Sequence, residues 1–137
     1  MEHIINVAGL EELADYNITR GFLAIGVFDG VHRGHQKLLT ELVSAAAEID
    51  AVPVVMTFYP HPRQILHSGQ QHPVLLLPPE RKVQLLHQYG ARAVITLHFD
   101  SVLAALEPEA FLNQCLGCNE VELAGICVGS NWRFGAK

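Results

Sequence analysis

Two histidines, His32 and His35, lie three residues apart in a glycine-rich segment that reads Gly26-Val27-Phe28-Asp29-Gly30-Val31-His32-Arg33-Gly34-His35. The apolar residues just before this segment are typical of a buried strand, and the residues after it have the apolar spacing of a helix. The sequence therefore predicts a strand, a tight turn and a helix start. Because residues three apart share one face of a helix, we expect both imidazole rings to point at one ligand.

A phosphate group is the ligand that this arrangement fits. The first N–H groups of a helix have no partners within the helix, and the helix dipole is positive at that end. Gly34 has no Cβ, so a phosphate can come close to the backbone. Imidazoles can donate hydrogen bonds to phosphoryl oxygens, where charge spreads during phosphoryl transfer. The alternative is two surface histidines on a helix cap, and the glycine-rich approach favours the phosphate site.

The rest of the chain supplies the elements that must position these residues. Strands are expected at residues 4–7, 23–28, 52–58, 93–97 and 122–128, and helices at 10–14, 34–49, 80–89 and 108–116. Alternating strands and helices predict an α/β fold, a Rossmann-like parallel sheet with helices on both faces. Ligands bind such sheets at the carboxyl ends of the strands. The segments 28–35, 59–62 and 129–135 all follow predicted strands, so we expect them at one edge of the sheet.

Composition excludes several classes of protein. The chain has 137 residues, 50% hydrophobic and 17% charged, which suits a single globular domain. Its net charge is −5 and it has no basic run, so nucleic acid is not expected as a partner. No apolar run reaches the roughly 18 residues that a membrane helix needs, and the first residues do not resemble a signal peptide. We expect a cytoplasmic protein that does not bind membranes; its oligomeric state is left open.

The three cysteines do not indicate a disulfide framework, because their number is odd. Cys115 and Cys118 form a Cys-x-x-Cys pair that could suggest zinc or redox chemistry. No second Cys or His pair has suitable spacing, and the pair follows a predicted helix instead of starting one. We therefore expect ordinary packing cysteines and no metal site built from protein side chains.

Several motifs together resemble bacterial FAD synthetases, the bifunctional riboflavin kinase/FMN adenylyltransferases. The glycine-rich segment 26–35 is similar to their signature, and Thr57-Phe58-Tyr59-Pro60-His61-Pro62 resembles their Thr-Phe-x-Pro-His-Pro loop. Glu80-Arg81-Lys82, with Leu85, Leu86 and Gly90, resembles their Glu-Lys helix. Phe99-Asp100 and residues 108–112 match the next block, and residues 128–135 resemble Val-Gly-x-Asp-Phe-Arg-Phe-Gly. The resemblance covers nearly the whole chain in the family's order.

This resemblance implies a nucleotidyltransferase fold of the His-x-Gly-His type and a reaction that moves AMP from ATP to FMN, with Mg²⁺, giving FAD and pyrophosphate. His32 and His35 would hold the ATP phosphates and stabilise the transferring phosphoryl group. The implied nucleotide-binding residues are Gly26, Phe28, Asp29, Gly30 and Gly34. The implied flavin-binding residues are Phe58, Pro60, His61, Pro62 and Asn131.

Alternatives remain open for some of these residues. Phe58 could simply end a buried strand, His61 could lock its loop by a hydrogen bond, and Asn131 could turn the chain. Another nucleotidyltransferase with a different phosphate acceptor, or a non-catalytic nucleotide- or flavin-binding module, are the competing functions. In the family the adenylyltransferase domain continues past Gly135 with a further strand and an arginine-bearing motif, followed by a riboflavin kinase barrel. We therefore expect residues 1–137 to be a single, incomplete adenylyltransferase domain.

Overall fold

A computed structural model of the chain describes residues 5–26, 28, 33–59, 78–98, 100–105, 110–111 and 121–128, with the backbone alone at residues 33, 34, 79, 104 and 128. The elements are β1 (Ile5–Val7), the 3₁₀ helix η1 (Leu10–Tyr16), β2 (Arg20–Ile25), α1 (Arg33–Glu48), β3 (Val52–Tyr59), α3 (Pro79–Gln88), β4 (Ala93–His98), α4 (Ser101–Ala104) and β5 (Glu122–Val128).

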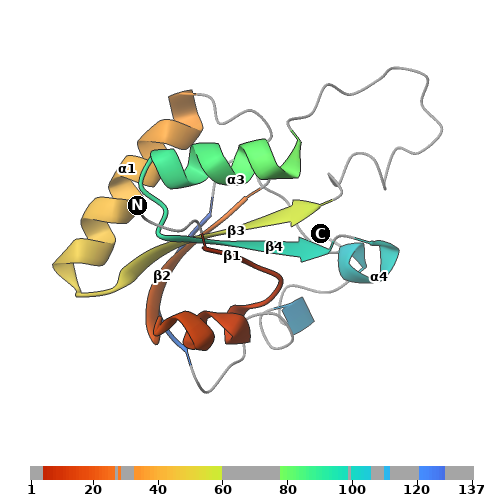
Figure 1. Ribbon diagram of the computed structural model, residues 1–137, viewed down its shortest axis with the longest axis horizontal. Helices are drawn as coiled ribbons and strands as arrows, with labels where there is room; N and C mark the ends of the chain where they lie inside the picture. The colour runs from red at the N-terminus through yellow and green to blue at the C-terminus, as the bar shows by residue number, and fades with distance from the viewer. Residues whose placement is uncertain are drawn as a thin grey trace.

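The strands form one sheet in the order β1-β4-β3-β2-β5, and every pairing is parallel. From β2 the chain adds β3 and then β4 on one side (Figure 1). Strand β5 returns to the other side of β2. The direction of strand addition thus reverses between β2 and β5. The α/β fold with a Rossmann-like parallel sheet is confirmed.

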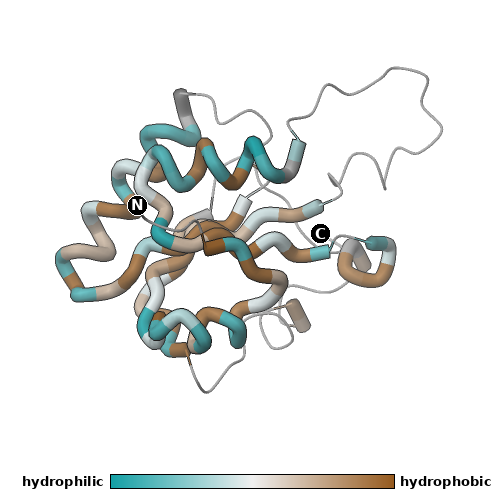
Figure 2. The backbone as a smooth tube through the Cα atoms, in the orientation of Figure 1, coloured by the Kyte–Doolittle hydropathy of each residue, from teal (hydrophilic) through white to brown (hydrophobic). Residues whose placement is uncertain are grey.

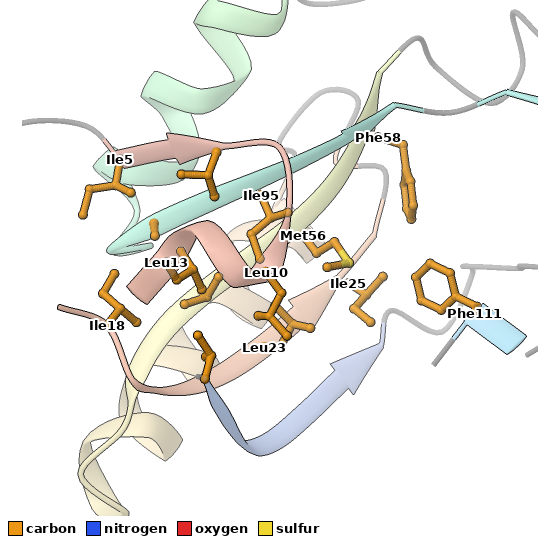
Figure 3. Packing of buried hydrophobic residues seen from close by; sticks show 14 of the residues in the cluster. Ile5, Leu10, Leu13, Ile18, Leu23, Ile25, Met56, Phe58, Ile95 and Phe111 are labelled. Carbon is orange, nitrogen blue, oxygen red and sulfur yellow. The ribbon is translucent and has the colours of Figure 1, made fainter. Parts of the chain in front are cut away.

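Each face of the sheet has its own hydrophobic core, because alternate residues of a strand point to opposite faces. On one face, α1 and α3 cover Ala24, Val55 and Val94. On the other face, η1 packs on a larger cluster that includes Leu23, Met56 and Ile95 (Figure 3). We call these the α1–α3 face and the η1 face. Within the described residues, helices of one kind or the other therefore cover both faces, as predicted.

The helices form where apolar residues repeat at helical spacing. In α1, Leu39, Leu42 and Ala46 are fully buried, and hydrophilic residues lie on the side of the helix that faces outward (Figure 2). Helix α3 starts with Pro79 at its first position, which suits a residue that has no N–H to donate. It ends at Gln88, and Gly90, whose φ is 118°, follows the C-cap residue Tyr89. Among the described residues, no helix is long and apolar enough to span a membrane.

An irregular pairing joins β5 to β2. The register shifts between Gly21 and Phe22, which pair with Leu123 and Gly125, so β5 has one extra residue there. The ring of Phe22 lies over Gly125, where an added Cβ would come within 2.6 Å of the ring. At the amino end, Arg20 forms an ion pair with Glu122 and donates a hydrogen bond to the carbonyl of Ile49 at 3.2 Å. These contacts fix the position of β5 beside β2.

One predicted strand differs from the observed one, and one observed helix was not predicted. We predicted a strand at residues 23–28, but β2 covers Arg20–Ile25, because the chain leaves the sheet at Gly26. The helix α4 was not predicted; the carboxylate of Asp100 caps it by accepting a hydrogen bond from the Leu103 N–H at 2.8 Å. Of the helix predicted at residues 108–116, only residues 110 and 111 are described, and both are helical.

Candidate active site

The glycine-rich turn leaves the sheet where the direction of strand addition reverses. The N–H of Gly26 donates to the carbonyl of Met56 at 3.1 Å, which extends the β2–β3 ladder by one residue. On the other side of β2, Ile25 pairs with Val128, so the carboxyl ends of β2 and β5 lie side by side. Open α/β sheets bind ligands in the crevice at this reversal. The turn therefore begins at the place in the sheet best suited to a ligand.

Phe28 has an unusual backbone in this turn. Its φ is 54°, in the left-handed region that bulky residues rarely adopt, yet its side chain is only 2% exposed. Such a conformation costs about 1–3 kcal/mol. Burying a phenylalanine side chain contributes about 1.5–3 kcal/mol, which can offset this cost. The fold thus keeps Phe28 where a glycine would be less strained, because its ring fills the core under the turn.

The ring of Phe28 lies between two other residues of the motif. A Cβ added to Gly26 would come within 3.0 Å of the ring, so the absence of a side chain there makes room for it. The Phe28 ring also packs against the imidazole of His35 in an edge-to-face arrangement, with the ring centroids 5.0 Å apart and the ring planes at 62°. The structure thus brings together three of the predicted site residues: Gly26, Phe28 and His35.

His35 is the third residue of α1 and lies in its first turn. Its side chain is partly buried, and its Nδ1 atom is fully buried. With Nδ1 buried, we expect any ligand contact of this ring to be made through Nε2. His35 thus lies at the N-terminal, positive end of the 16-residue helix α1, which favours an anion beside it.

Lys82 is a buried cation at this edge of the sheet. Its side chain is 6% exposed, and its ammonium donates to Thr57 Oγ1 at 3.3 Å and to the Phe58 carbonyl at 3.5 Å. Lys82 thus links α3 to the carboxyl end of β3. We quoted Lys82 for the family resemblance but did not predict it or Thr57 as site residues. The signal was available, because Lys82 precedes the buried Val83 and lies one turn before the buried Leu86.

Replacing Lys82 with methionine tests this link. Methionine keeps much of the apolar stem and removes the two hydrogen bonds, so we expect the free energy of unfolding to fall by about 1–2 kcal/mol. Thermal or urea unfolding measures the change. Lys37 is exposed on α1, and Lys37→Met is the matched control, expected to change stability by less than about 0.5 kcal/mol. Equal losses in the two variants would contradict a structural role for the Lys82 ammonium.

Phe58 lies on the other face of the sheet. Its side chain is 1% exposed and belongs to the η1-face cluster, where it lies at the end that also contains Phe111 (Figure 3). By alternation along β3, the neighbouring Thr57 faces α3, where it meets Lys82. A flavin contact by Phe58 stays a prediction; in the structure the ring is part of the core.

The remaining predicted site residues are outside the described part of the chain. These are His32, Asp29, Gly30, Pro60, His61, Pro62 and Asn131, as well as Cys115 and Cys118. Gly34 is described only as backbone within α1, and Cys127 is a partly buried free cysteine in β5. Within the ranges that the structure describes, no three His, Cys, Asp or Glu side chains are grouped so that they could hold a metal ion.

Comparison with known proteins identifies the family. The sequence model of a family described as FAD synthetase matches residues 16–137. The chain belongs to the FAD synthetase family. The match includes β2, the glycine-rich turn, α1 and every strand that follows.

Characterised relatives in this family are longer. The bifunctional riboflavin kinase/FMN adenylyltransferase of Bacillus subtilis is 36% identical over 95 residues, which cover 69% of this chain and 30% of the relative. The protein of the same description in Escherichia coli K12 is 32% identical over 130 residues, or 95% of this chain and 41% of the relative. An FAD synthetase of Listeria monocytogenes is 35% identical over 113 residues, or 82% and 45%. The chain thus spans less than half the length of these relatives.

One solved structure has the same fold over almost the whole chain. It is a crystal structure described as a macrolide-efflux protein from Streptococcus pneumoniae, with a TM-score of 0.78 and 26% sequence identity. The match covers 98% of this chain and 45% of that one. The chain described here therefore corresponds to one part of a larger structure in that protein.

Proposed function

We propose that this chain catalyses the transfer of AMP from ATP to FMN, giving FAD and pyrophosphate. An oxygen of the FMN phosphate attacks the α-phosphorus of ATP, and the bond from that phosphorus to the pyrophosphate oxygen breaks. No covalent enzyme intermediate is needed, because the acceptor phosphate is itself the nucleophile. Membership of the FAD synthetase family supports this reaction. The observation that carries it is His35 in the first turn of α1, beside the reversal in strand order.

The residues of the turn act by positioning and by stabilising charge. With Nδ1 of His35 buried, Nε2 donates a hydrogen bond to the phosphoryl oxygens as negative charge builds up on them. The N-terminal end of α1 adds its dipole to the same field. His32 shares this work according to the family resemblance.

Mg²⁺ enters this proposal as the ion carried by the ATP phosphates. Magnesium commonly binds through substrate phosphates and water with only one or two carboxylates, so it needs no dedicated cage of side chains. This mode of binding is compatible with the lack of a cluster of three possible metal ligands in the part of the protein described by the structure. When bound, the ion would neutralise phosphate charge.

The test is direct product formation. The protein is incubated with ATP, Mg²⁺ and FMN, and FAD and pyrophosphate are measured as equimolar products. Transfer of AMP to another phosphate acceptor, such as a pantetheine phosphate, without FAD formation would favour a different nucleotidyltransferase. Calorimetric binding of FMN or ATP without any turnover would indicate a binding module and would overturn the proposal.

A further inference from the structure

The orientation of the His35 ring requires an explanation beyond its place in α1. The outer torsion of a histidine side chain has broad, roughly two-fold preferences, so a helix backbone alone does not fix the plane of the ring. A donor to a transition state must be held within a narrow range of angles to be effective. A neighbouring group must therefore help to hold the imidazole, and the edge-to-face packing with Phe28 is a contact that can do so.

We infer that Phe28 is a positioning residue for His35, with its ring held between Gly26 and the imidazole so that Nε2 faces the ATP phosphates. The inference rests on the proposed function for its kinetic part. It differs from the direct nucleotide contact that the family resemblance implies, because a side chain that is 2% exposed offers a ligand almost no surface.

Three observations support this role. The left-handed backbone of Phe28 is kept at a cost, which points to a place determined by its surroundings. A side chain at Gly26 would crowd the Phe28 ring, because an added Cβ would come within 3.0 Å of it. Phe28 also belongs to the buried cluster of the α1–α3 face, together with Leu39 of α1, and this packing restricts its position. The buried core therefore restricts the Phe28 ring, and this ring in turn restricts the orientation of the imidazole.

The test combines proton NMR with steady-state kinetics on Phe28→Leu. Leucine keeps the Cβ, so the backbone cost is unchanged, and it removes the aromatic ring. In the wild type we expect a nuclear Overhauser effect between the two rings and ring-current shifts on the His35 protons, assigned by their loss in His35→Ala. In Phe28→Leu we expect these shifts to disappear and kcat for FAD formation to fall about tenfold to a hundredfold, with KM for ATP changing less.

Phe111→Leu is the matched control. Phe111 is 3% exposed and belongs to the η1-face cluster, so the same substitution removes a buried ring elsewhere. We expect it to lower the melting temperature while leaving the His35 signals and kcat unchanged. A fall in kcat equal to that of Phe28→Leu would show that general loss of packing, not positioning, explains the effect.

Gly26→Ala gives a second perturbation that leaves Phe28 in place. The added methyl group would press on the ring at 3.0 Å, so we expect smaller shifts of the same His35 signals and a smaller loss of kcat. If His35 signals stay at their wild-type positions in both variants, the inference is wrong. A rise in KM for ATP with kcat unchanged would instead support a direct contact between Phe28 and the nucleotide, and it would overturn the inference.

The two proposals fail in different ways. If the wild type makes no FAD, the proposed function fails, and the NMR spectra still decide whether Phe28 holds the imidazole. If FAD is made and Phe28→Leu moves the His35 signals without changing kcat, the proposed function stands and the positioning role is overturned.

Discussion

Replacing His35 with alanine is expected to lower kcat for FAD formation about 100- to 1,000-fold, the usual loss when one donor to a developing oxyanion is removed. The reason is geometric, because His35 lies in the first turn of α1 and the proposed donor to the phosphoryl oxygens is its Nε2 atom, Nδ1 being buried. The loss is expected in kcat and in kcat/KM alike, since the contact strengthens in the transition state. Steady-state kinetics with ATP and FMN measures it.

His87→Ala is the control for this prediction. His87 lies near the end of α3, where its Nδ1 is 3.0 Å from the Ala91 carbonyl, just before the amino end of β4. Its removal costs a local hydrogen bond at the amino end of β4, whereas the glycine-rich turn begins at the carboxyl end of β2. We therefore expect kcat to stay at the wild-type value. Melting temperatures of both variants separate loss of fold from loss of chemistry. Unchanged kcat in a folded His35→Ala protein would remove His35 from the catalytic mechanism.

Replacing Gly90 with alanine is expected to lower the free energy of unfolding by about 2–4 kcal/mol. Gly90 has a φ of 118°, which side chains rarely adopt, and an added Cβ would come within 2.6 Å of Val43 Cγ2 on α1. Its N–H donates to the His87 carbonyl at 3.0 Å, and the next N–H, of Ala91, donates to the Leu86 carbonyl at 3.1 Å, which satisfies the end of α3. Urea unfolding measures the loss.

A double-mutant cycle separates the two causes. Adding Val43→Ala to Gly90→Ala removes the clash with α1 and leaves the backbone strain, so the double variant should be more stable than additivity predicts by about 1 kcal/mol. Gly9→Ala is the control, because its Cβ would meet only the mobile end of the Glu11 side chain and φ there is −155°. Strict additivity would show that contact with Val43 does not matter.

The sequence predicted the strands and helices whose periodicity is strong. In α1, Leu38, Leu39, Leu42, Val43 and Ala46 fall on one face, and the helix appears within one residue of the expected bounds. The strands at residues 52–58, 93–97 and 122–128 were found within one residue at either end. Hydrophobic periodicity reports burial directly, so it is reliable where one face of an element is buried.

The features that sequence reasoning missed depend on contacts between distant residues. No local pattern predicts a left-handed backbone at Phe28, because an aromatic residue adopts it only when the core holds its ring. The spacing of Lys82 to Leu86 indicates the buried face of α3, but the acceptors of its ammonium are in β3, 24 and 25 residues away, and no local pattern identifies them. Gly26, Phe28 and His35, which were predicted from the sequence as site residues, lie in contact in the structure, and their roles in a site stay predictions.

The order of the strands has a consequence for how this protein folds. The β2, β3 and β4 strands pair with partners that follow soon after in the chain, whereas β1 and β5 depend on distant partners, as the Asn6–Thr96 and Arg20–Glu122 contacts show with separations of 90 and 102 residues. Closing such long loops costs entropy before any contact compensates for it, which makes these pairings slow. On a ribosome, the reversal beside β2 cannot exist until residue 128 has been synthesised. The part of the sheet where the glycine-rich turn begins is thus completed by the most distant pairing in the sheet.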